Sequence, residues 1–204
     1  MKVRLFAGVP LIVGLALLFT LAVVWWSFSR RGRWLDSVFA PLGLKGSVYM
    51  LSGRRCQGTL DGRQVDVRFM RGPMLTLYVS TPLQTRLGIG EKNALTSGFA
   101  GIAGKQALDT GDPDYASLCI YPNDEAWARA LLADPEAKAA LLRLMNTSEW
   151  ALFHQVILEQ GNWLLRLYRN KGLFRYAIAP EEARQWFDDL LTLARVGESL
   201  PAPQ

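Results

Sequence analysis

The stretch Leu5–Trp26, LFAGVPLIVGLALLFTLAVVWW, decides how the rest of the chain is arranged. No charged residue interrupts it, and Thr20 is the one polar side chain within it. At a rise of about 1.5 Å per residue, a helix over these residues is about 33 Å long, enough to cross a hydrocarbon core of about 30 Å. The sequence therefore predicts a single transmembrane helix over residues 5–26.

A cleaved signal peptide is the main alternative for this segment. Such a peptide has a shorter apolar centre, of about 7–15 residues, and small residues at its cleavage site. Here the apolar run is followed by Ser27–Arg31, SFSRR, after two tryptophans. Bulky and basic side chains stand where small ones are required, so we expect the helix to remain as an anchor.

Aromatic and basic residues form a collar after the apolar run. Indole rings suit the headgroup layer, where one side of the ring is wet. The predicted membrane-interface residues are Trp25, Trp26, Trp34, Arg30, Arg31 and Arg33. Positive residues favour the cytoplasmic side of a membrane, and slightly more of them follow the span than precede it. The charge pattern therefore slightly favours a cytoplasmic C-terminal domain.

The chain divides by composition into an anchor (1–29), a basic juxtamembrane linker (30–45), a soluble domain (46–198) and a tail (199–204). The net charge of +5 is unevenly spread. Residues 1–60 hold eight Lys/Arg and one Asp, whereas residues 61–204 hold fifteen Lys/Arg and seventeen Asp/Glu. The basic part can meet anionic headgroups, and the mildly acidic domain argues against a nucleic-acid partner.

The first part of the domain, Arg55–Ser80, is predicted to be a β-meander. Asp61-Gly62 accepts the positive φ of a type I′ hairpin turn. Apolar side chains then alternate with polar ones on two strands: Val65, Val67, Phe69, and Leu75, Leu77, Val79. Residues 82–113 are irregular and rich in glycine, and a loop of this length is often functional. That stretch is where we expect a site first.

The remainder alternates strand and helix signals. A short strand is expected over Ser117–Tyr121, then helices capped by Asn123 and by Asp134 with Pro135 at the first turn. A hairpin follows over residues 150–167 with its turn at Gly161-Asn162, a further strand through residues 174–178, and a last helix from Pro180. Hairpins and blocks of helices favour an α+β fold: antiparallel sheet, as a β-meander plus a hairpin, packed with about three helices.

The triplet Asp109-Thr110-Gly111 resembles the catalytic Asp-Thr-Gly of retropepsin-like aspartic proteases. The resemblance implies a dimer in which two such aspartates share a proton and activate a water. The family has an apolar strand before the triplet and a small residue after it. Here residues 104–108, GKQAL, precede it and Asp112 follows. A polar turn is the competing interpretation, because Asp, Gly and Pro dominate residues 109–114.

Other chemistry is weakly supported. Asp109, Asp112 and Asp114 lack the regular spacing and distal Glu of a calcium loop. His154 is the one histidine and lies in an alternating apolar pattern, so we expect a buried side chain. No metal and no cofactor is expected. Cys56 and Cys119 are buried thiols in a reducing compartment, or a bridge if the domain is outside.

Core packing is the first expectation for the tryptophans of the domain, and the alternative is that Trp150 and Trp163 form an exposed patch that binds a partner. Residues 110–115 (TGDPDY), 124–127 (DEAW) and 131–135 (LLADP) resemble a pattern in uncharacterised single-pass bacterial membrane proteins. That resemblance implies a bacterial origin and no activity.

Together these features predict a non-enzymatic, membrane-anchored interaction domain, an accessory or scaffolding subunit of a membrane-associated complex. Its expected partners are the lipid bilayer and another protein or a second copy of the chain. One alternative is an anchored aspartic protease that depends on Asp109. Another is a domain that binds a small ligand or a lipid in an apolar pocket between sheet and helices.

Overall fold

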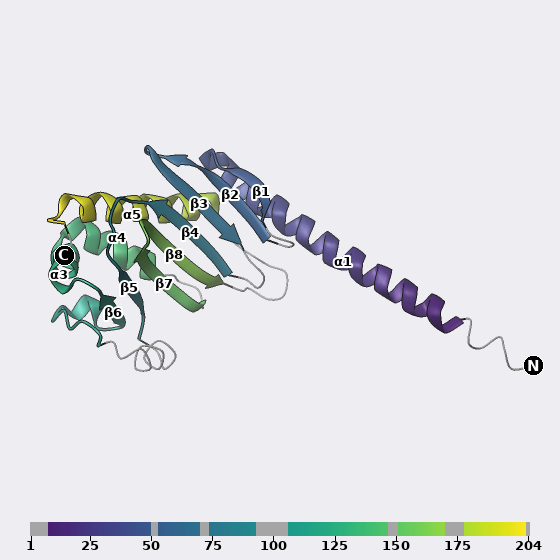
Figure 1. The fold of residues 1–204 in the computed structure, drawn as a ribbon, viewed down its shortest axis with the longest axis horizontal. Helices are drawn as coiled ribbons and strands as arrows, with labels where there is room; N and C mark the ends of the chain where they lie inside the picture. Colours follow the sequence, from purple (N-terminus) through teal and green to yellow (C-terminus); the bar gives the residue numbers. More distant parts are fainter. Residues whose placement is uncertain are drawn as a thin grey trace, which may run out of the picture.

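An eight-stranded antiparallel sheet forms the body of the protein, in the order β1-β2-β3-β4-β8-β7-β5-β6 (Figure 1). The computed structural model describes residues 8–49, 53–69, 74–92, 106–146, 151–169 and 178–202. The strands are β1 Lys45–Tyr49, β2 Gly53–Leu60, β3 Arg63–Phe69, β4 Met74–Ser80, β5 Leu87–Glu91, β6 Leu118–Pro122, β7 Ala151–Glu159 and β8 Asn162–Arg169. The predicted α+β class with antiparallel sheet is confirmed.

Four α-helices lie in the described residues: α1 Gly8–Phe39, α3 Glu125–Ala133, α4 Pro135–Met145 and α5 Pro180–Ser199. The helix α5 packs on β4 and β8, α4 packs on β7, and the end of α1 packs on β1 and β2. The rest of α1 extends away from the sheet toward the N-terminus (Figure 1). The other face of the sheet carries no described α-helix.

The first hairpin forms as its sequence predicts. Asp61 and Gly62 have φ values of 48° and 78°, which a type I′ turn requires, and Leu60 pairs with Arg63 across the turn. Val65, Val67 and Phe69 are buried while their neighbours face the other side of the sheet. The second predicted hairpin also forms, but its turn lies one residue earlier. Gln160 and Gly161 take the positive φ values, and Asn162 begins β8.

Three further boundaries differ from the sequence prediction. Residues 30–39, predicted as linker, continue α1 because their apolar side chains reach the core. The predicted irregular stretch 82–113 contains β5, which pairs with β7 and β6. Asp124, and not Asn123, caps α3, since its carboxylate accepts the Trp127 N–H. The cap at Asp134 and the helix start at Pro180 are confirmed, and the strand predicted through residues 174–178 lies mainly outside the described residues.

The two cysteines are both buried and free. Cys56 lies on β2 and Cys119 on β6, with five strands between them in the sheet order. Six strand spacings amount to about 29 Å, whereas a disulfide needs Cα atoms within about 7 Å. Burial raises the pKa of Cys56 to about 11, so this thiol stays protonated at neutral pH.

A carboxylate near the end of α5 ties this helix to the sheet. Arg63 donates from both terminal nitrogens to the two oxygens of Glu198, at 2.6 and 2.7 Å. The Thr81 hydroxyl donates to the same carboxylate at 2.6 Å. These donors, Arg63 first, hold the pKa of Glu198 below its ordinary value. The pairing therefore contributes stability above the ordinary glutamate pKa of about 4.3, and that contribution is lost as pH falls through the folded pKa.

We expect Glu198→Gln to lower the free energy of unfolding by about 1–2 kcal/mol at pH 7, because charge-assisted hydrogen bonds become neutral ones. The difference from wild type should begin to shrink as pH falls below about 4.3 and should be lost once the pH is below the lowered pKa of Glu198 in the folded protein. Urea unfolding of the full chain in a neutral detergent over a pH series measures this difference.

The matched control is Asp188→Asn, which removes an exposed carboxylate paired with Arg184 on the same helix. It should change stability little. Equal losses in the two variants at pH 7, or a Glu198→Gln deficit that does not shrink between pH 7 and pH 3, would contradict the role of the Glu198 pairing.

Candidate functional site

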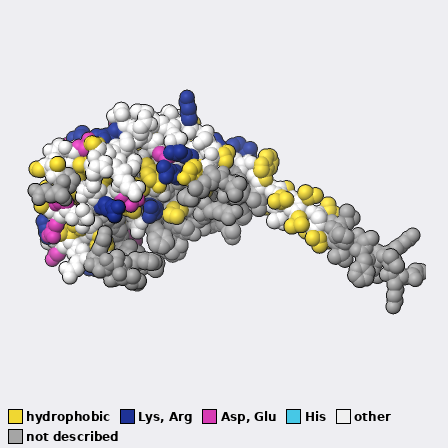
Figure 2. All heavy atoms as spheres, viewed as in Figure 1, with side chains coloured by type: hydrophobic (Ala, Val, Ile, Leu, Met, Phe, Trp, Pro, Cys, Tyr) yellow, Lys and Arg dark blue, Asp and Glu magenta, His cyan; other side chains and the backbone are white. Residues whose placement is uncertain are grey.

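Within the described residues, the N-terminal part of α1 carries nearly all of the exposed large apolar side chains. Leu18 and Phe19 are 65% and 72% exposed, and Trp25 is 73% exposed. Figure 2 shows hydrophobic side chains along the described part of this projecting helix. A folded domain rarely leaves a long apolar surface in water. We therefore expect this segment to be covered by another protein or by the lipid of a membrane.

The residues predicted at a membrane interface divide between two environments. Trp26 is exposed, and the Arg30 guanidinium lies 5.4 Å from its ring centre, within the range of a cation–π contact. Arg33 is exposed, while the Arg31 side chain is outside the described set. Trp34 is partly buried and packs against the core of the domain. Among the described residues, no helix combines the length and the apolarity that a membrane crossing needs.

The C-terminal part of α1 is built into the domain. Leu35, Val38 and Phe39 are buried in the main core, with no more than 2% of each exposed. The rings of Phe39 and Phe187 meet edge to face, with 6.4 Å between their centres, and this contact joins α1 to α5. One uninterrupted helix therefore runs from an exposed apolar segment into the core.

An ion pair fixes the orientation of this end of α1. Arg54 on β2 donates from Nε to Asp36 at 3.1 Å and pairs through Nη2 with the second carboxylate oxygen. The Arg54 side chain reaches the pair by passing over Gly32, where a Cβ would lie 3.8 Å from its Cδ. Gly46 on β1 is equally important, because a Cβ there would overlap the Asp36 carboxylate. Glycine at 46 thus permits the close approach of α1 to the sheet.

We expect Gly46→Ala to break the Asp36–Arg54 pair and to lower the free energy of unfolding by about 1–3 kcal/mol, since the carboxylate must move. Hydrogen exchange should show faster exchange of the α1 amides at residues 32–39. The control is Gly88→Ala on β5, where a Cβ meets nothing within 4 Å. If both variants keep wild-type stability and exchange, the pair does not hold α1 in place.

The protease-like triplet forms an exposed turn. The Asp109 carboxylate accepts the Gly111 N–H at 3.0 Å, and the Thr110 hydroxyl accepts the Asp112 N–H at 3.3 Å. Gly111 has a φ of 67°, which glycine adopts without strain. This arrangement is the polar turn that composition offered as the alternative, and it uses Asp109 to close the turn.

The neighbouring acidic residues bind a lysine. Lys138 on α4 pairs with Asp112 at 2.5 Å and with Asp114 at 2.7 Å. These hydrogen bonds raise the pKa of Lys138 and lower that of Asp112. No group of three or more His, Cys, Asp or Glu in the described ranges could hold a metal ion. The carboxylates therefore serve to attach residues 109–116 to α4.

The other residues singled out from the sequence are structural or lie outside the described ranges. His154 is buried on β7, on the face that the helices cover. Trp163 is fully buried, so it packs in the core as first expected and does not contribute to an exposed patch. It lies on the helix-covered face of β8 opposite Leu158, and no part of its ring reaches the surface. Trp150 is not among the described residues.

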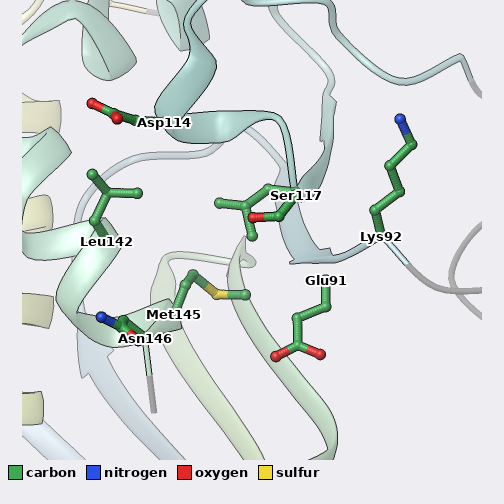
Figure 3. A pocket seen from close by; sticks show the side chains of 8 residues that line it. Glu91, Lys92, Asp114, Ser117, Leu142, Met145 and Asn146 are labelled. Carbon is green, nitrogen blue, oxygen red and sulfur yellow. The ribbon is translucent and has the colours of Figure 1, made fainter. Parts of the chain in front are cut away.

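A cleft of about 510 Å³ lies beside β5 and β6 (Figure 3), the strands at the opposite edge of the sheet from β1 and β2, which contact α1. Glu91 and Lys92, at and just after the end of β5, line one side of it, and Leu142, Met145 and Asn146, at the end of α4, line the other. The cleft therefore draws on the stretch 82–113 that the sequence marked for a site, although residues 93–105 lie outside the described ranges. The space between sheet and helices, where a ligand pocket was predicted, is filled in its described part by the main core.

The sheet face opposite the helices carries a cluster that sequence patterns did not reveal. We call it the Arg–Tyr cluster, and it consists of Tyr49, Arg55, Asp66, Arg68 and Tyr78. Arg55 donates from Nε and Nη2 to the two oxygens of Asp66, both at 2.8 Å. Arg68 donates from Nε to the same carboxylate at 2.7 Å. Strand alternation placed these residues on one face, but only the register brings them together.

The chain matches no family model and no curated protein. A solved structure with a similar fold is the crystal structure of the mycobacterial trehalose monomycolate transport factor A, TtfA. The TM-score is 0.57 and the sequence identity is 12%, with 85% of this chain and 98% of that chain covered. At this identity the likeness shows a shared fold, in which the α+β architecture described above extends over nearly all of TtfA.

Proposed function

We propose that this protein is a non-enzymatic accessory factor that is anchored in a membrane by α1 and presents its α+β domain to another protein or to a second copy of itself. The carrying observation is the continuity of α1, which runs from exposed apolar residues to a buried end at Phe39. A stiff connection of this kind sets the orientation of a domain relative to whatever holds the helix.

Three features support the membrane as the environment of the exposed part of α1. The sequence from Leu5 to Trp26 has no charged residue. Its first three residues lie before the described part of α1, which begins at Gly8. Its described large side chains are exposed, which in water leaves apolar surface uncovered. Trp26 and Arg30, which contact each other, are residue types that suit the headgroup layer of a membrane. The charge balance favours a cytoplasmic domain, which remains part of the proposal.

The accessory role is supported by what the candidate catalytic residues do. Asp109 closes an exposed turn, Asp112 and Asp114 bind Lys138, and His154 is buried. TtfA, which shares the fold, is by name a transport factor. From it we extend to this chain only an accessory role in a membrane-associated transport process, since a shared fold does not transfer an activity.

The anchor is tested by placing charge inside the apolar run. Leu15→Arg with Leu18→Arg puts two guanidiniums near the middle of the span, each of which costs about 2.5–3.5 kcal/mol on insertion scales. Wild type should float with membranes on a density gradient after an alkaline carbonate wash. The double variant should leave the floating fraction and stay in the load fraction, whereas an aggregated protein would collect in the pellet.

The matched control is Ser37→Arg, which adds a charge at an exposed position of the same helix beyond the apolar run. It should float like the wild type. Wild-type protein that is released by carbonate alone, or a double variant that still floats, would contradict the anchor.

The partner is tested by purifying the full chain from its own membranes in a mild detergent and identifying the bound proteins by mass spectrometry. We expect one protein in stoichiometric amount, or a dimer of the chain. A control chain that keeps residues 1–29 but carries an unrelated folded domain should lose that protein. Recovery of a lone monomer would contradict the accessory role.

A further inference from the structure

The Arg–Tyr cluster shows its positive charge to the surface and hides its negative charge. The side chains of Arg55 and Arg68 are 30% and 32% exposed, whereas that of Asp66 is 12% exposed. Two guanidiniums share this one carboxylate, so the group carries a net positive charge of one. Lys and Arg side chains also gather where α1 meets the sheet (Figure 2). An anion that approaches this face meets the cations first.

Hydrogen-bond donors remain after the internal pairing. Asp66 accepts from Nε and Nη2 of Arg55 and from Nε of Arg68. Nη1 of Arg55 and both terminal nitrogens of Arg68 take no part in these bonds. A planar guanidinium directs such donors at two oxygens of one tetrahedral anion, which is why arginine is frequent in phosphate sites.

Aromatic rings hold Arg68 in place before any ligand binds. Its guanidinium carbon lies 4.3 Å from the centre of the Tyr78 ring and 5.8 Å from that of Tyr49. The Arg55 guanidinium is also 5.8 Å from the Tyr49 ring. Stacking and the bond to Asp66 restrict the rotamers of both arginines, so little side-chain entropy is lost when an anion binds.

A third arginine extends the cluster across the sheet. Arg68 pairs with Thr76 on β4, and Thr76 pairs with Arg166 on β8, so the two arginines lie in one row on the same face. In the described part of the chain, Arg166 is half-buried and has no ion pair. Asp66 and Glu159 are the acidic residues that the described strands place on this face. Glu159 lies beside the β7–β8 turn, two rows of side chains away from the row of Arg68 and Arg166.

We infer that the Arg–Tyr cluster is a binding site for a phosphate group. The net charge, the exposed donors and the fixed guanidiniums match a singly or doubly charged tetrahedral anion. The phosphate belongs either to an anionic lipid headgroup or to a soluble molecule, and the two sources share this chemistry.

The position of the cluster favours the lipid. Arg54, the residue before Arg55, contacts α1 at Gly32 and Asp36. Gly32 lies six residues beyond Trp26, about 9 Å along the helix axis. If Trp26 marks the interface, the cluster lies at the level of the headgroups. This choice of source rests on the proposed membrane anchor, whereas the anion site does not.

The test is native mass spectrometry of the full chain released from a neutral detergent. Phosphatidylglycerol and phosphatidylcholine with the same acyl chains are offered in turn, and inorganic phosphate is titrated separately. The main variant is Arg68→Gln, which leaves the Arg55–Asp66 pair intact and removes the excess charge. Arg55→Gln leaves the Arg68–Asp66 pair and serves if the first variant unfolds.

The control is Arg184→Gln, which removes an exposed arginine from α5 on the other side of the sheet. Every variant keeps the basic collar of α1, so lipid held there is common to all. We expect wild type and control to retain phosphatidylglycerol over phosphatidylcholine, and Arg68→Gln to lower that retention about tenfold.

Phosphate binding that Arg68→Gln weakens, without a preference for phosphatidylglycerol, keeps the site and assigns it a soluble phosphate. Equal binding of either ligand by wild type, Arg68→Gln and Arg55→Gln overturns the site. Because the phosphate titration needs no bilayer, a failure of this inference is distinct from a failure of the anchor, which flotation measures.

Discussion

The structure depends on the burial of one end of a helix whose other end is exposed. Leu35, Val38 and Phe39 enter the same core as the sheet and α5, so α1 cannot move independently of the domain. The Asp36–Arg54 pair and the absence of a side chain at Gly46 set the angle at which the helix leaves. The helix is uninterrupted over its 32 residues, so the orientation set at its buried end extends to its exposed apolar end.

The sheet separates two kinds of chemistry. One face is apolar, and the helices seal it with buried aromatic and aliphatic side chains. The other face mixes polar residues with apolar ones such as Leu164, and it bears the Arg–Tyr cluster on the opposite side of the sheet from the end of α1. Asp66 is largely buried between two partly exposed arginines, so the cost of desolvating its carboxylate offsets much of the attraction in these ion pairs. Its physical effect is to hold two guanidiniums in fixed positions with a surplus of positive charge.

The likeness to TtfA concerns architecture. Two chains with 12% identity reach the same fold when the same pattern of buried positions recurs, since many apolar side chains fill a core equally well. Binding residues are under no such constraint, so the fold alone transfers neither a ligand nor a partner. The site must be argued from the side chains of this chain.

Local signals in the sequence determined much of the fold. Asp61-Gly62 specified a type I′ turn, alternation specified β3 and β4, and Asp134-Pro135 specified the start of α4. The α+β class followed from the order of these elements. The apolar run before Trp26 is equally a property of sequence, because the length of a charge-free segment needs no tertiary contact to define it.

Tertiary structure decided what depends on contacts between distant residues. It extended α1 to Phe39, because residues predicted as a linker found the core. It buried Trp163, turned Asp109 into part of a surface turn and assigned Asp112 to Lys138. It also brought Arg55, Asp66 and Arg68 together through strand register. Sequence periodicity reports which face a side chain takes, but only strand pairing determines its neighbours on that face.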